Sequence, residues 1–188
     1  MDMKHDTAWR YLLTSAIQSF ALLLALVLST PAQARSVGYK FNPAFKPIIP
    51  KLARVLIPIA LPSWLPHVTA TSPVYADAHD VSSTTYVIDL SDTRYCHGAN
   101  ACRLGSVSGG WTADTPGVLF TPTKGTPVKL HGGVVGIFYP FQCGASCGDS
   151  LLMWHKRGIP YTVSIKGGSK QDTVAMANSA LDDTFTNR

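Results

Sequence analysis

The chain has 188 residues, of which 46% are hydrophobic and 14% are charged, and its formal net charge is +5. All of its 11 acidic residues are aspartate, so every mechanism that needs a glutamate acid, base or metal ligand is excluded. Among these are the HExxH zinc proteases and the calcium loops that end in a glutamate.

The positive charge is unevenly distributed along the chain. Residues 35–76 contain five Lys or Arg and no acid, whereas from Asp77 onward nine Asp balance nine Lys and Arg. A neutral domain argues against nucleic acid as a partner, because proteins that bind it need a basic face to displace phosphate counterions. The basic segment is suited to contact an anionic lipid or wall polymer, and the alternative is a solvated leader.

Residues 1–34 have the three parts of a secretory signal peptide. A short charged start precedes an apolar run over residues 12–28, and small residues with a proline follow it up to Ala34. We predict cleavage after Ala34. The alternative is an uncleaved membrane anchor, because a run of about 17 residues is near the lower limit for a spanning helix. The expected location is therefore exported, either periplasmic or extracellular.

Residues 35–66 are predicted to form a basic, proline-rich arm in front of a single domain, residues 67–188. The six prolines of the arm leave no room for a long helix, so it should run extended. Its second half has too many apolar residues for a free linker and is expected to pack on the domain. The alternative is a short helical turn at residues 51–56 that packs only loosely.

The domain alternates strand-like segments with turn residues, which is typical of an antiparallel sheet. The strongest candidate is residues 84–90, where Tyr86, Ile88 and Leu90 share one face. The other candidates are residues 68–74, 103–108, 128–131, 134–138, 151–155 and 161–166. Two-residue hairpin turns are predicted at Gly132-Gly133 and around Arg157-Gly158.

The last segment changes to a helical period. Ser169 is suited to cap the N-terminus, and Asp172 lies at the end of the helix dipole that favours a negative charge. The predicted apolar stripe consists of Val174, Ala177, Leu181 and Phe185. The predicted fold is therefore α+β, an antiparallel β-sheet meander of about five to seven strands with one C-terminal helix packed on a face.

Four cysteines in an exported chain are expected to form disulfides, because compartments beyond the inner membrane are oxidising. Small residues between Cys96 and Cys102, and between Cys143 and Cys147, favour two local bridges; cross-bridging between the two loops is the alternative. The same spacings do not match the repeated C-x2-4-C of a zinc site. No metal and no cofactor are predicted.

The candidate catalytic residues are of two kinds, a serine and the cysteines. Residues 144–148 match G-x-S-x-G, but that motif works where a strand turns into a helix, and a strand is predicted after it. A thiol enzyme would need a free cysteine beside a histidine such as His97, His131 or His155. The enzyme alternative is thus a small envelope hydrolase or thiol enzyme that uses Ser146 or a cysteine with His155.

Aromatic residues near the cysteines are candidates for ligand binding. Trp111 lies in a connection rich in Gly and Pro, and Tyr139 and Phe141 precede the second cysteine loop. These side chains are suited to line a groove for a lipid, peptide or glycan, because aromatics supply large contact area at low entropy cost. The alternative is core packing, which is the expectation for Trp154.

Several short motifs together resemble a group of small exported bacterial proteins of unknown function. The motifs, within about residues 56–183, are LPSWLP from Leu61, CHGANAC from Cys96, CGASC from Cys143, then Trp154, Gly158 and Tyr161, and ANSA from Ala177. The ending is also similar to domains of unknown function in envelope-associated anti-sigma and sporulation proteins. Neither resemblance brings a substrate or catalytic residues with it.

The favoured function is an exported, non-catalytic binding or structural module of the cell envelope. Its partner is an envelope component, a lipid, glycan or protein, held at the end of the sheet that carries the aromatic residues and cysteine loops.

Overall fold

The structure is a computed structural model that describes residues 40–66, 72–110 and 125–186. These residues belong to one compact unit, Tyr39–Arg188. The predicted signal peptide and Trp111 fall outside the described residues. In the described part of the chain, no helix is long and apolar enough to cross a membrane.

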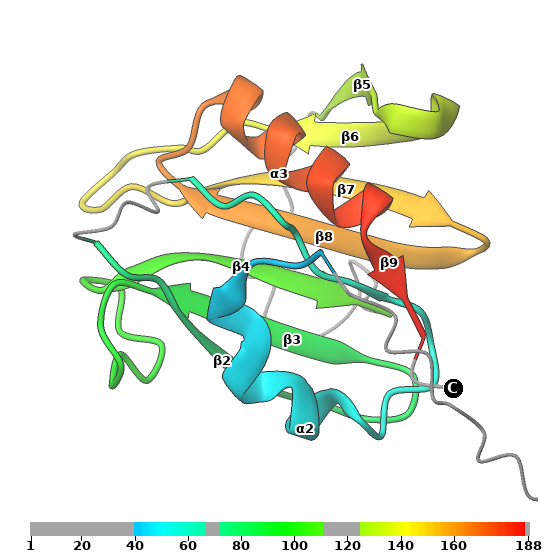
Figure 1. Cartoon of the computed structure of the whole chain (residues 1–188). Helices are drawn as coiled ribbons and strands as arrows, with labels where there is room; N and C mark the ends of the chain where they lie inside the picture. Colours follow the sequence, from blue (N-terminus) through cyan, green and yellow to red (C-terminus); the bar gives the residue numbers. More distant parts are fainter. Residues whose placement is uncertain (1–39, 67–71, 111–124, 187–188) are drawn as a thin grey trace, which may run out of the picture. The chain divides into compact units, whose positions relative to one another are not determined.

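Seven antiparallel strands form the main sheet in the order β2-β3-β4-β8-β7-β6-β5 (Figure 1). The strands are β2 (Tyr75–His79), β3 (Tyr86–Ser91), β4 (Arg103–Gly109), β5 (Thr126–Lys129), β6 (Val135–Tyr139), β7 (Asp149–Lys156) and β8 (Ile159–Lys166). They make two meanders, β2 to β4 and β5 to β8, which join where β4 pairs with β8. The predicted α+β class with an antiparallel sheet meander is confirmed.

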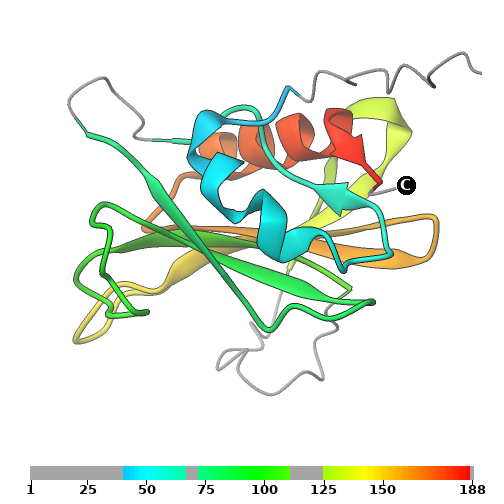
Figure 2. The same ribbon diagram turned by 60° about the horizontal axis from the view of Figure 1, so that its bottom comes forward.

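The C-terminal helix α3 (Lys170–Asp182) lies over one face of the sheet (Figures 1 and 2). As predicted, Ser169 is its N-cap, and the Ser169 hydroxyl accepts a hydrogen bond from the backbone N–H of Asp172 at 3.1 Å. The residues that α3 buries are Thr173, Met176, Ala177, Ala180 and Leu181. The predicted stripe is therefore correct at Ala177 and Leu181, but it missed the neighbouring row of the same face.

The two outer members of the predicted stripe are the ones that differ. Val174 is only partly buried, because the buried row runs through Thr173 and Met176 at the spacing of one helical face. Phe185 is buried, but it lies beyond the helix in the short strand β9 (Thr184–Phe185).

The prediction that the basic arm runs extended is wrong for residues 43–52. They form a 3-10 helix η1 (Pro43–Ile48) and one turn of α-helix, α2 (Ile49–Leu52). Proline is compatible with the first turn of a helix, because its φ is preset and its missing N–H has no intrahelical partner there. Pro43 and Pro50 occupy such positions, so the prolines divide the segment into short helices instead of abolishing them.

This segment is part of the hydrophobic core. Phe45, Leu52, Val55 and Leu61 are completely buried, so the alternative of a loosely packed turn is wrong. The segment continues into β1 (Ile59–Ala60), which pairs with β9 in a separate two-stranded sheet. Packing against the main sheet therefore begins at Phe45, earlier than the predicted second half of the arm.

Two buried tyrosines attach this segment to the main sheet. The Tyr86 hydroxyl accepts a hydrogen bond from the backbone N–H of Ala60 at 2.9 Å. The Tyr161 hydroxyl donates one to the carbonyl of Pro58, also at 2.9 Å. Burial raises the pKa of Tyr161 to about 12 and raises the pKa of Tyr86 as well, so both phenols stay protonated and able to donate.

The hairpin between β7 and β8 has the predicted two-residue turn. Arg157 and Gly158 have φ values of 54° and 78°, which is the left-handed conformation that such turns require. The hairpin also carries Trp154, which is 1% exposed and stacks on Tyr161 with ring centroids 5.7 Å apart. The expectation that Trp154 belongs to the core is confirmed.

The two-residue turn predicted at Gly132-Gly133 is wrong. Between β5 and β6 the chain makes a short 3-10 turn, η2 (His131–Gly133), closed by a hydrogen bond from the Leu130 N–H to the Val134 carbonyl at 2.8 Å. The longer loop is explained by its contact with α3, because Nδ1 of His131 lies 2.8 Å from a carboxylate oxygen of Asp182.

The first strand is also displaced from its prediction. The candidate at residues 68–74 falls mainly outside the described residues, and β2 begins after it, at Tyr75. The β2 sequence YADAH carries charged residues and small alanines, which is unlike an apolar strand. Such a sequence is tolerated because β2 lies at an edge of the sheet.

Candidate binding surface at the cystine end of the sheet

The two loops that contain the disulfides lie at the same end of the main sheet (Figure 1). The first loop, residues 92–102, joins β3 to β4, and the second, residues 140–148, joins β6 to β7. In an antiparallel sheet the C-terminal ends of β3, β8 and β6 lie beside the N-terminal ends of β4 and β7, at the same end of the strands. We call this end of the sheet, with its two loops, the cystine end.

The disulfides are Cys96–Cys102 and Cys143–Cys147, with Cα–Cα distances of 5.7 and 4.0 Å. The favoured local pairing is therefore confirmed, and the alternative of cross-bridging between the loops is wrong. None of the four cysteines is a free thiol. Disulfides are typical of an oxidising, exported location.

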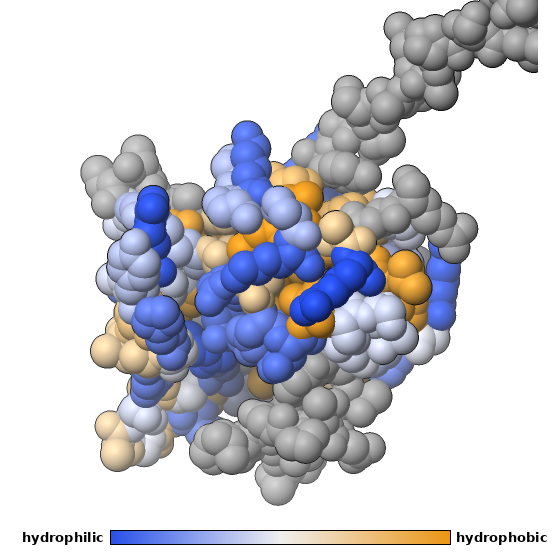
Figure 3. All heavy atoms as spheres, turned by 90° about the horizontal axis from the view of Figure 1, so that it is seen from below, coloured by the Kyte–Doolittle hydropathy of each residue, from blue (hydrophilic) through white to orange (hydrophobic). Residues whose placement is uncertain are grey.

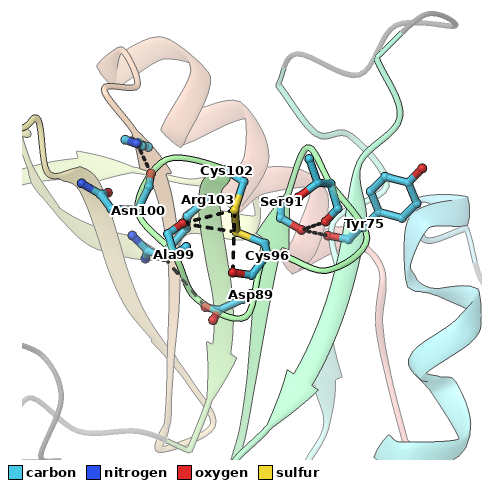
Figure 4. Close-up of a disulfide and its surroundings, with 10 residues drawn as sticks. Tyr75, Asp89, Ser91, Cys96, Ala99, Asn100, Cys102 and Arg103 are labelled. Atoms are coloured by element: carbon cyan, nitrogen blue, oxygen red, sulfur yellow. Dashed lines mark hydrogen bonds and ion pairs between the residues drawn. A yellow bond between two sulfur atoms is a disulfide. The ribbon is translucent and has the colours of Figure 1, made fainter.

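The first loop contains a tight turn directly after Cys96 (Figure 4). The Ala99 N–H donates to the Cys96 carbonyl at 2.9 Å, and the two residues between them, His97 and Gly98, have φ values of 48° and 75°. Glycine adopts this left-handed conformation freely, but a residue with a Cβ pays about 1–2 kcal/mol. His97 shares this conformation with Arg157 in the β7–β8 turn, so it marks a tight turn at both places.

The end of β8 lies between the two loops and holds both of them. Lys166 donates a hydrogen bond from Nζ to the carbonyl of Asn100 in the first loop. The next residue, Gly167, donates its N–H to the carbonyl of Gly148 in the second loop at 3.1 Å. The loops come from distant parts of the sequence, and this shared neighbour fixes one relative to the other.

An ion pair joins the exits of the two loops. Arg103, which follows Cys102, makes two parallel hydrogen bonds of 2.8 and 2.6 Å to the carboxylate of Asp149. The Asp149 side chain is only 9% exposed and also accepts a hydrogen bond from the Ser164 hydroxyl at 2.6 Å. Bidentate pairs of this kind are strong and geometrically specific, so they hold the bases of both loops in place.

The first loop presents aromatic and cationic side chains to solvent. Tyr95 is 77% exposed, and its ring stacks on His97 with centroids 6.4 Å apart. The guanidinium of Arg94 lies 5.8 Å from the ring centroid of Tyr75 at the start of β2. The cystine end therefore carries a flat, exposed aromatic pair beside a cation, at the start of the segment that the first disulfide closes.

Two of the three predicted ligand-binding residues lie at this end of the sheet, and the third lies outside the described residues. Tyr139 ends β6 and is partly buried, and Phe141 is 38% exposed in the second loop. Trp111 lies outside the described residues. Ligand binding by these three residues stays a prediction. Tyr95 was missed, although an aromatic residue beside a cysteine in a polar loop was a usable signal.

The residues named for an enzyme are not brought together. Ser146 lies in a loop between two strands, which is not the strand-to-helix turn of a hydrolase elbow. His155 is near the far end of β7, and six residues of strand, at about 3.3 Å each, put it about 20 Å from Asp149. Among the described residues there is also no group of three or more His, Cys or Asp side chains that could hold a metal ion.

Comparisons with models of protein families, with curated proteins and with solved structures found no match to this chain. The resemblance to small exported bacterial proteins therefore stays a prediction. The site's own residues define its chemistry: exposed aromatic faces, a cationic neighbour, and disulfide-containing loops that are tied to the sheet.

Proposed function

We propose that this protein is an exported, non-catalytic binding module of the cell envelope, in the periplasm or outside the cell, and that it binds its ligand at the cystine end. The ligand is an envelope component, a lipid, glycan or protein. One observation supports this most directly: Tyr95 and Phe141 expose their rings directly before the two disulfide-closed segments, in loops that are fixed to each other through Lys166 and Gly167.

The rigidity of the loops favours binding. Ordering a loop when a ligand binds costs conformational entropy, and a loop that is already fixed avoids much of that cost. Tyrosine adds large contact area with only two side-chain torsions to immobilise. The Arg103–Asp149 pair and the two disulfides therefore support a preformed binding surface.

The non-catalytic part of the proposal rests on the separation of the reactive groups. The four cysteines are bonded in pairs, so no thiolate is present to act as a nucleophile. Ser146 and His155 lie toward opposite ends of β7 and cannot share a proton.

The proposal can be tested by recovering the protein with its bound partner from the native envelope. The double variant Tyr95→Ser/Phe141→Ser removes both exposed rings without touching the core. Val135→Ser is the matched control, because Val135 is 59% exposed and begins β6 at the opposite end of the sheet. Bound components are identified by mass spectrometry after gentle extraction and quantified against the protein.

We expect one component to copurify with the parent chain and with the control. The double variant should lose about tenfold or more of it, as expected when central aromatic contacts are removed. If the double variant retains as much of every bound component as the parent does, the cystine end is not the binding surface.

A further inference from the structure

A second exposed surface is formed by residues 43–56, which we call the basic cap. Phe45, Ile48, Leu52 and Val55 point into the core and are at most 3% exposed. The residues between them are exposed, except Ile49, which is partly buried against the core. The cap is thus a rigid amphipathic layer, although its sequence suggested an arm.

The outer side of the basic cap carries only positive charge. Its exposed ionisable residues are Lys46, Lys51 and Arg54, and residues 40–76 contain no acid. Lys51 is paired with Asp77 at 2.8 Å, and its hydrogen bond lowers the pKa of that carboxyl, so the two charges offset each other. Lys46 and Arg54 have no ion pair among the residues that the structure describes.

An exposed leucine lies next to these cations in the chain. Leu56 is 73% exposed, more than any other large aliphatic side chain among the described residues. Its position is fixed, because its backbone N–H donates to the carbonyl of Ser83 at 2.8 Å. Figure 3 looks at the side of the molecule where α2 lies and shows strongly hydrophilic and hydrophobic side chains next to one another there.

We propose that the basic cap docks the protein on the surface of an anionic lipid bilayer. Lys46 and Arg54 meet the phosphates of the headgroups, and Leu56 enters the boundary between headgroups and acyl chains. The cations alone would suit any polyanion, but a soluble polyanion offers no apolar layer for Leu56. The proposal shares no residue with the cystine end and does not depend on the proposed function.

The test measures binding to vesicles by co-sedimentation, using the protein as its producing cell processes it. Vesicles of phosphatidylglycerol mixed with phosphatidylcholine are compared with vesicles of phosphatidylcholine alone. The variants are Lys46→Gln/Arg54→Gln and Leu56→Ser. The matched control is Lys129→Gln/Arg157→Gln, which removes the same charge from exposed positions outside the cap. Residues before Lys40 are the same in all of these proteins, so their contribution cancels.

We expect binding to the anionic vesicles only, and weaker binding at higher salt, because exposed charges are screened. Loss of both cap cations should weaken it about 25-fold, at about fivefold for each cation. Leu56→Ser should weaken it several-fold at low and at high salt, because its contribution is not ionic. The control should stay within about twofold of the parent.

Three results would overturn the proposal. The first is an absence of binding to anionic vesicles. The second is an equal loss in the control, since net charge and not the cap would then be responsible. The third is a combined result: Leu56→Ser binds vesicles as well as the parent does, and the parent binds inorganic polyphosphate as tightly as it binds anionic vesicles. A soluble polyanion would then be the partner.

Discussion

The two ends of the main sheet are closed in different ways. At the cystine end, loops of residues 92–102 and 140–148 extend from the strands, and disulfides close residues 96–102 and 143–147 within them. At the opposite end, the turn end, the connection from β7 to β8 is only Arg157 and Gly158. This two-residue turn is set by its left-handed backbone conformation, whereas each loop at the cystine end contains a disulfide.

This difference between the two ends separates residues that fix the backbone of a turn from residues that are available to bind a ligand. A two-residue turn has no room for a ligand surface, and its sequence is dictated by the left-handed conformation that it must adopt. The longer loops escape that constraint, because side chains such as Tyr95 and Phe141 contribute nothing to closure and can face solvent. The disulfides then add to the stabilisation that Lys166, Gly167 and the Arg103–Asp149 pair give these loops.

The largest effect should come from reducing both disulfides, which tests whether the cystine end depends on them. Loop-closure entropy predicts about 2 kcal/mol for each short bridge and about 4 kcal/mol together. Equilibrium denaturation with and without reductant, with thiols counted to verify reduction, measures the loss. Backbone hydrogen exchange should rise in residues 92–102 and 140–148 and stay unchanged at the turn end. An unchanged denaturation curve would show that the loops are held without the bridges.

The next effect should come from Arg103→Met, which breaks the link between the bases of the two loops. It leaves the Asp149 carboxylate nearly buried without its charged partner, and we expect a loss of about 3 kcal/mol. Arg157→Met is the control at the turn end and should change stability by less than about 0.5 kcal/mol.

The double variant Arg103→Met/Asp149→Leu distinguishes the ion pair from simple packing. The double variant also removes the Asp149 carboxylate, which Arg103→Met leaves without a charged partner. It should therefore be more stable than Arg103→Met alone. If the single variant is as stable as the parent in denaturant, the ion pair does not hold the loops together.

The smallest effect should come from Gly158→Val at the turn end. Valine would place a β-branched side chain at φ 78°, at a cost of about 1–3 kcal/mol. Gly158→Asn is the conservative variant, because asparagine tolerates left-handed backbone, and it should recover most of the loss. Urea denaturation under oxidising conditions compares the three proteins. Equal stability of the valine variant would mean that the turn imposes no such constraint.

The parts of the fold that could be predicted are those set by local sequence. Alternation identified β3 through Tyr86, Ile88 and Leu90, and a capping serine located the start of α3 at Ser169. The pairing of β4 with β8 could not be predicted, because it joins strands that lie far apart in the chain. The short helices at residues 43–52 were missed because the prolines were read as helix breakers, and not as residues of a first turn.

The candidate site shows the same division. The two disulfides were predicted, since each pair is close in sequence. The Arg103–Asp149 pair was not, because its members come from β4 and β7 and meet only when β8 lies between them. Binding surfaces of this kind are assembled by topology, so no local pattern in the sequence indicates them.

The pairing of β1 with β9 has a consequence for the order in which the protein forms. β1 has β9 as its only partner strand among the described elements, so β1 stays unpaired until residues 184–185 have been synthesised or exported. A chain that emerges from its N-terminus, from a ribosome or through a membrane, holds Ile59 unpaired during most of that passage. Contacts between distant segments also form late in folding. The pairing of β1 with β9 is therefore delayed until almost the whole described chain is present. This part of the protein stays unfolded while the chain is still being synthesised or exported.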